Sequence, residues 1–214
     1  MIARPAVEAE ATLGESRWPP AIALLAFTVL NVVIRFWLPR EGTLRVPYLV
    51  PAVEVVLLIV LFAANPGNVA IHRARLRRLA LVLVVVLVLA ALWATSLLVA
   101  DIIRGTGVTS SPRQLLATGA MVWLGNNLGF ALLYWLVDSG GPTARTQQGV
   151  PIDFAFTQQM SPELAPAGWH PVFLDYLHLG FTNATAFSPT DVMPLTHRAK
   201  YTMLVQSTVA LGAT

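Results

Sequence analysis

The sequence contains no cysteine and only one lysine, Lys200, among its 214 residues. The absence of cysteine excludes a disulfide framework, a thiolate metal site and a cysteine nucleophile. Charged residues make up 12% of the chain, whereas a soluble domain usually carries about 25%. The other basic residues are arginines, which we attribute to GC-rich coding in a bacterial source. The HExxH, GxSxG and Walker motifs are also missing, so the sequence predicts neither an enzyme nor a bound cofactor.

Hydrophobic residues make up 56% of the chain and are grouped in long blocks. Long apolar blocks with few charges are typical of proteins that cross a membrane several times. We therefore predict an all-α, multi-pass helical bundle in the cell membrane, the inner membrane of a bacterium, with the lipid bilayer as its main partner. No nucleic-acid motif is present, and the arginines flank apolar runs, where membrane topology accounts for them.

The apolar blocks predict a transmembrane region over residues 18–137, with four spans at about 18–38, 46–64, 79–100 and 113–137. Residues 1–17 carry three glutamates and predict a disordered tail followed by an uncleaved anchor, because a signal peptide would have a basic start.

Residues 138–170 are rich in Pro, Gly, Gln and Ser and predict a linker. Its aromatic residues Phe154, Phe156 and Trp169 are expected to pack against the fold. Residues 171–214 predict a helix over 171–187, a polar turn and the start of a last helix that continues in a longer protein. The helix over 171–187 would be roughly 25 Å long, shorter than the ~30 Å hydrocarbon core, which favours a re-entrant segment.

The densest positive cluster is formed by Arg73, Arg75, Arg77 and Arg78, just before the third span. Cytoplasmic loops carry an excess of arginine and lysine, so this loop is expected to be cytoplasmic. The N-terminus and the chain after residue 137 are then cytoplasmic too. We interpret the cluster as a topology signal in preference to a site for lipid headgroups.

Glu54 lies in the middle of the second span, where an ionisable residue suggests function and needs a partner. Arg35 is the candidate partner, with Asn31 one turn earlier on the same helix face. The pair is interpreted as a buried ion pair that sets the register of two helices, with a proton or ion relay as the alternative.

Asn126 and Asn127 lie near the middle of the fourth span, where they predict interhelical hydrogen bonds or, alternatively, a polar pathway. Gly125 and Gly129 form a GxxxG pair that favours close helix approach. Thr95 and Ser96 of the third span are expected to bond to carbonyls of their own helix.

The residues His170, Asp175 and His178 could suggest a metal, but a third ligand at helical spacing is missing, so no metal site is predicted.

The least typical stretch, residues 181–200, is FTNATAFSPTDVMPLTHRAK, a polar segment between two apolar ones. Irregular backbone at membrane depth is tolerated only where it is buried in protein or lines a watery cavity. The candidate residues for a pore-like loop are Thr182, Asn183, Thr185, Ser188, Thr190 and Asp191.

This stretch resembles the pore loop of two-helix potassium-channel domains. The match lies in D-x-x-P-x-T over residues 191–196, after a threonine-rich helix end and before an apolar helix. The resemblance implies a homo-oligomeric pore for a monovalent cation. It departs at residues 186–190, AFSPT, where the channels have two glycines and where Pro189 fixes φ and removes a donor. Potassium selectivity is therefore not implied. Channel pore loops also enter from the outside, opposite to the orientation that the arginines predict.

Nearly the whole chain is similar to a bacterial family of uncharacterised multi-pass membrane proteins. The similarity lies in four spans, Tyr134-Trp135 running into D-S-G-G-P, the P-E-L-A-P linker, and FTNATAFSPTDVMPLT. The family has no assigned function. Three functions stay open: a channel-like protein, a non-conducting membrane scaffold, and a transporter that uses Glu54.

Overall fold

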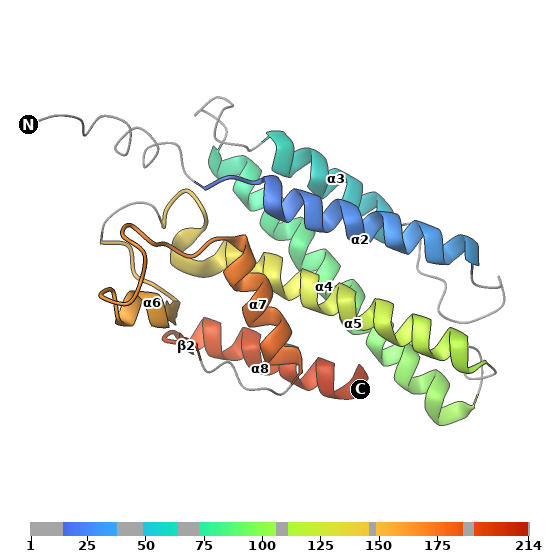
Figure 1. The fold of residues 1–214 in the computed structure, drawn as a ribbon. Coiled ribbons are helices and arrows are strands. Elements are labelled where there is room, and N and C mark those ends of the chain that lie inside the picture. Colours follow the sequence, from blue (N-terminus) through green and yellow to red (C-terminus); the bar gives the residue numbers. More distant parts are fainter. Residues whose placement is uncertain are drawn as a thin grey trace, which may run out of the picture.

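The computed structural model describes residues 15–37, 49–63, 73–105, 111–145, 149–185 and 191–213. These residues form a mostly helical, all-α fold with one small antiparallel sheet (Figure 1). The helices are α2 (Trp18–Trp37), α3 (Leu49–Ala63), α4 (Arg73–Arg104), α5 (Pro112–Val137), α6 (Thr157–Met160), α7 (Phe173–Ala184) and α8 (His197–Ala213). The short elements are the 3-10 turn η3 (Asp138–Gly140) and the strands β1 (Phe154–Phe156) and β2 (Val192–Pro194). The all-α prediction is confirmed.

Within the described residues, two helical stretches are long and apolar enough to cross a membrane, Arg75–Arg104 and Pro112–Gly140. Two shorter apolar stretches, Trp18–Val29 and Val50–Ala63, lie in α2 and α3. The exposed faces of α2, α4 and α8 also carry large apolar side chains, among them Ile22, Leu25, Val82, Leu89, Trp93, Leu204 and Leu211.

Helix α4 begins earlier than the sequence predicts, because the arginine cluster forms its first turns instead of a loop. Arginine is a good helix former, so the helix already begins within the arginine cluster, and the change from charged to apolar residues marks a change of environment inside it. Thr95 and Ser96 donate to the carbonyls of Ala91 and Leu92, each at 2.9 Å, as predicted.

Helix α5 is the central helix and packs against α2, α4, α7 and α8 (Figure 1). A Cβ atom at Gly125 would lie 2.8 Å from the ring of Phe27 in α2, and one at Gly129 would lie 3.4 Å from Val88 in α4. The GxxxG prediction of close helix approach is therefore confirmed, and the two glycines serve different neighbours.

The segment predicted to be a linker contributes to the fold through β1, which pairs antiparallel with β2 and places Phe156 opposite Val192. Phe154 and Phe156 are 1% and 2% exposed, so the prediction that its aromatic residues pack against the fold is confirmed. A three-residue strand and a four-residue helix are too short to produce a visible period in the sequence. The strand partner also lies 38 residues further along the chain.

Candidate functional site

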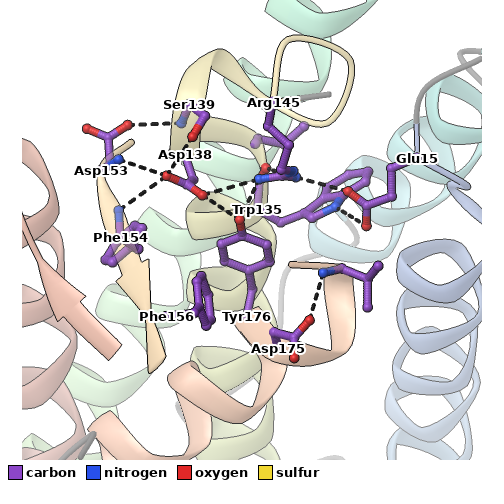
Figure 2. Close-up of polar contacts among 12 residues, drawn as sticks. Glu15, Trp135, Asp138, Ser139, Arg145, Asp153, Phe154, Phe156, Asp175 and Tyr176 are labelled. Atoms are coloured by element: carbon purple, nitrogen blue, oxygen red, sulfur yellow. Dashed lines mark hydrogen bonds and ion pairs between the residues drawn. The ribbon is translucent and has the colours of Figure 1, made fainter. Parts of the chain in front are cut away.

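A buried polar cluster lies at the end of the bundle where α5 ends and where α7 and α8 begin (Figure 2). We call it the Asp138 cluster; its members are Glu15, Trp135, Asp138, Ser139, Arg145, Asp153 and Tyr176. Three of these residues are carboxylates with at most 8% exposure. A buried carboxylate is tolerated only when charges and hydrogen-bond donors replace water around it.

Asp138 stands at the centre of the cluster and is 1% exposed. Its Oδ1 atom accepts the backbone N–H groups of Asp153 at 2.9 Å and Phe154 at 3.2 Å. Its Oδ2 atom accepts the Tyr176 hydroxyl at 2.5 Å and lies 3.5 Å from the guanidinium of Arg145. Asp138 therefore connects the end of α5 to β1 and α7. Burial raises the pKa of Tyr176 above its usual range, so its hydroxyl stays protonated and donates to Asp138.

A local turn makes this arrangement possible. After α5 the backbone has positive φ at Ser139 (52°), Gly140 (77°) and Gly141 (97°), a region that glycine enters without penalty. A Cβ atom at Gly141 would lie 3.0 Å from the carbonyl oxygen of Leu136. The reversal brings Arg145 back to the end of α5, where it donates to the Trp135 carbonyl oxygen at 2.9 Å.

Asp153 connects the cluster to α8. It accepts two hydrogen bonds from Arg198, each at 2.5 Å, and one from the Thr196 hydroxyl at 2.6 Å. The backbone N–H of Ser139 donates to it at 3.1 Å. Burial acts to raise the pKa of Asp153, but the hydrogen bonds from Arg198 and Thr196 outweigh it and hold this pKa below its usual range.

Glu15 connects the N-terminal segment to α7. Its Oε1 atom accepts the Trp135 indole N–H at 2.8 Å and the Phe173 backbone N–H at 2.9 Å, and its Oε2 atom lies 3.1 Å from Arg145. Burial raises the pKa of Glu15 above its usual range, although Arg145 and these donors act against it. The prediction of a disordered tail is wrong for residues 15–17, where Glu15 and Arg17 are buried. Their partners lie more than 100 residues away, which the sequence cannot reveal.

A second polar group, the Asn183 cluster, lies deeper in the bundle and joins α5, α7 and α8. Asn183 donates to the Gln206 side chain at 2.9 Å, and the Tyr134 hydroxyl donates to the same oxygen at 2.7 Å. Gln206 in turn donates to the Gly180 carbonyl oxygen at 2.8 Å, and Ser207 donates to Asn183 at 3.1 Å. A Cβ atom at Gly180 would lie 3.3 Å from the backbone oxygen of Asn127, so glycine allows α7 to approach α5 closely.

Four of the residues predicted for a pore-like loop lie in the described part of the chain, and these four do not converge on one point. Asn183 faces the protein interior, whereas the hydroxyls of Thr182 and Thr185 bond to carbonyls of α7 itself. Asp191 lies 3.3 Å from the His178 ring. Ser188 and Thr190 lie outside the described residues.

The polar residues predicted inside the membrane are buried where the structure describes them. Glu54 and Asn126 are both 0% exposed, and Asn127 donates to the Trp123 carbonyl oxygen at 3.4 Å. The side chains of Asn31 and Arg35 lie outside the described part of α2, so the predicted pair of Arg35 and Glu54 stays a prediction.

The residues considered for a metal have other contacts. Asp175 accepts the Val172 backbone N–H at 2.7 Å and caps the start of α7, and the His170 ring lies 3.4 Å from the Gly168 carbonyl oxygen. In the part of the chain that the structure describes, no three His, Cys, Asp or Glu side chains are grouped to hold a metal ion.

The Asp138 cluster was not among the sequence candidates. Its only local signal is the D-S-G-G-P motif, in which an aspartate ends a helix before two glycines. The hydrogen bonds occupy both oxygens of each cluster carboxylate, which is typical of a structural junction.

Neither the protein-family models, nor the curated proteins, nor the solved structures contain a match to this chain.

Proposed function

We propose that the chain is an integral protein of the cell membrane in which α2, α3, α4 and α5 are four spans and α8 packs against α4 and α5. The surface of the helices supports this proposal. The exposed faces of α4 and α8 carry bulky apolar residues, including Trp93 (63% exposed), Leu204 (62%) and Leu211 (77%). Large contiguous apolar surfaces are rare on soluble monomers, whereas lipid covers them in a membrane.

The arginine distribution supports a cytoplasmic location for the end of the bundle that carries the Asp138 cluster. Arg75, Arg77 and Arg78 begin α4 there, and Arg198 is in the first turn of α8. A concentration of arginine at one end of a membrane bundle favours the cytoplasmic side.

Within this membrane protein we propose a channel-like function for the α7 segment, carried by one observation: α7 and α8 both begin at the Asp138 cluster. Phe173, at the start of α7, donates to Glu15, and Thr196, just before α8, donates to Asp153. The 12 residues of α7 cover roughly 18 Å, too short for the ~30 Å hydrocarbon core. The chain therefore enters the bundle as a helix and returns to the same end before α8, the path of a pore loop.

Several copies of this hairpin around an axis would form a pore for a monovalent cation. The C-terminal turn of α7 packs against α8, where Asn183 donates to Gln206, and the negative end of a helix dipole favours a cation. Rings of backbone carbonyls and acidic side chains supply the remaining ligands in such pores. Thr185 ends the described part of the α7 segment, and Asp191 begins the next described part, which leads through β2 to α8.

The test is cation flux through liposomes that contain the purified full-length protein. We expect flux in the wild type and reduced flux in Thr185→Val and Asp191→Asn. Thr208→Val is the matched control, because Thr208 bonds to the Leu204 carbonyl oxygen at 2.9 Å just as Thr185 bonds to that of Phe181. No flux in the wild type, or a monomer in a light-scattering measurement, would rule out this pore.

A non-conducting scaffold is the second candidate, and the Asn183 cluster favours it. Its hydrogen bonds satisfy Asn183 and Gln206 within the chain, as expected for a rigid packing element. This function predicts a stable protein without flux, in which Asn183→Leu lowers the thermal stability.

A transporter is the third candidate, since the Glu54 carboxyl is completely buried in α3. It predicts pH-dependent uptake that Glu54→Gln abolishes, measured in the same liposomes.

A further inference from the structure

Arg77 is a half-buried cation at the start of α4 whose hydrogen bonds are incomplete. Its Nη2 atom donates to the Leu136 carbonyl oxygen at 3.3 Å. Its Nε atom is buried and has no hydrogen-bond partner among the described residues. In the same part of the chain, no carboxylate oxygen lies within 4.0 Å of its guanidinium. A buried N–H donor without an acceptor is destabilising, and more so when the group is charged.

A second cation lies on the neighbouring helix. Helices α4 and α8 are in contact, and Arg198 is in the first turn of α8. Arg198 is bound by Asp153, but its side chain is still 58% exposed. Among the described residues, Asp153 is the carboxylate that lies within 4.0 Å of either guanidinium at this junction, and it is bound to Arg198.

The other buried charges at this end are paired with one another. Arg145 lies 3.1 Å from Glu15 and 3.5 Å from Asp138, and Arg198 is bound to Asp153. The exposed Arg75, Arg78 and Lys200 add further positive charge on the first turns of α4 and α8.

We infer that the junction of α4 and α8 binds the phosphodiester headgroup of an anionic membrane lipid. A guanidinium matches the geometry of a phosphate with two parallel N–H groups, and the N-termini of α4 and α8 add their positive dipole ends. Basic pockets between membrane helices on the cytoplasmic side are the expected location of such headgroups.

The surface of α8 favours a lipid over a free phosphate ion. Tyr201 (67% exposed) follows Arg198 on the same helix, and Leu204 and Val205 continue the exposed surface toward the C-terminal end of α8. Tyrosine is enriched at the membrane interface, and the apolar residues below it offer a surface for an acyl chain. The inference rests on membrane insertion and does not depend on ion conduction.

The experiment is a thermal-unfolding titration of the purified full-length protein in neutral detergent, followed by tryptophan fluorescence. Phosphatidylglycerol is expected to raise the Tm in a saturable manner, and phosphatidylcholine is expected to leave it unchanged. Arg77→Gln should weaken the apparent affinity for phosphatidylglycerol by about tenfold or more, as expected for loss of a charge-assisted hydrogen bond. Arg104→Gln, which removes an exposed charge at the other end of α4, is the control and should behave like the wild type.

Arg77→Lys provides a second variant, since it keeps the positive charge and replaces the planar guanidinium fork with a single ammonium group. This variant is expected to fold and to bind phosphatidylglycerol more weakly than the wild type. Native mass spectrometry measures this by counting the lipid molecules that stay bound to each variant. The inference would be overturned if phosphatidylglycerol raised the Tm of the wild type, Arg77→Gln and Arg77→Lys equally at every lipid concentration. Stabilisation by inorganic phosphate without stabilisation by the lipid would overturn the lipid as ligand. Carbonate extraction tests membrane insertion separately: release of the chain from membranes would refute the proposed function itself.

Discussion

Replacement of Asp138 is the most informative single perturbation of the fold, because this carboxylate joins α5, β1 and α7. In Asp138→Ala, the backbone N–H groups of Asp153 and Phe154 and the hydroxyl of Tyr176 lose their acceptor. Arg145 keeps its contact with Glu15, so the guanidinium is not left without a carboxylate.

The magnitude follows from the number of donors. Each buried donor without an acceptor costs about 1–3 kcal/mol, and breaking a buried ion pair costs roughly 3–5 kcal/mol. We expect a loss of about 4 kcal/mol for Asp138→Ala. Asp138→Asn keeps one oxygen for the two backbone donors and should lose about 2 kcal/mol. For a chain of this size 1 kcal/mol corresponds to roughly 2–4 °C in Tm, so the expected decreases are about 8–16 °C and 4–8 °C.

The assay is thermal unfolding in detergent micelles, monitored by tryptophan fluorescence. Asp175→Ala is the control: it removes an aspartate that accepts one N–H at the start of α7 in an exposed position, and it should lose about 1 kcal/mol. A decrease in Tm for Asp138→Ala no larger than that for Asp175→Ala would refute the central role of Asp138.

Three further predictions concern stability and use the same assay. Gly141→Ala should destabilise the protein by about 3 kcal/mol, because φ is 97° and the new Cβ would lie 2.8 Å from an arginine nitrogen. The control Gly149→Ala, where φ is 79° and the space around the new Cβ is open, should lose only about 1 kcal/mol. Equal losses in the two variants would contradict the steric argument. The pKa of Asp153 is below its usual range in the folded state, so the unfolded chain binds more protons and stability is lost as the pH falls below about 4. If the Tm of Asp153→Asn falls with pH as steeply as that of the wild type, Asp153 is not the cause of this loss. Gln206→Leu should lose about 2–3 kcal/mol, because its buried partners stay in place without a hydrogen bond. The control Thr208→Val on the exposed face should lose less than about 0.5 kcal/mol. Similar losses in the two variants would show that the Asn183 cluster does not stabilise the bundle.

Much of the helical fold could be predicted from the sequence because long apolar runs have few alternatives to a helix in a bundle. The run that forms α4 is almost entirely Leu, Val and Ala, and only its start was misjudged, because the arginines continue the helix. The close approach at Gly125 and Gly129 was predictable from their spacing, but the identity of each neighbour was not.

The candidate site could not be predicted in the same way, since its contacts are far apart in the chain. Trp135 and Glu15 are separated by 120 residues, and Tyr176 and Asp138 by 38. Asn183 was correctly singled out as unusual, but its polarity serves hydrogen bonds to Gln206 that only the packing of α7 on α8 reveals. A polar residue in an apolar segment indicates a partner without identifying it.

In the proposed topology the chain enters the membrane with α7 and returns to the same side before α8. Because the chain has no cysteine, single cysteines can be introduced by Glu163→Cys, Met193→Cys and Arg104→Cys, all at exposed positions. Labelling with a membrane-impermeant maleimide on intact and permeabilised cells then reports the side of each position. Positions 163 and 193 are expected to be protected in intact cells and to react after permeabilisation, whereas position 104 should react from outside. Reaction of positions 163 and 193 from opposite sides would mean that α7 crosses the membrane, and would contradict the claim.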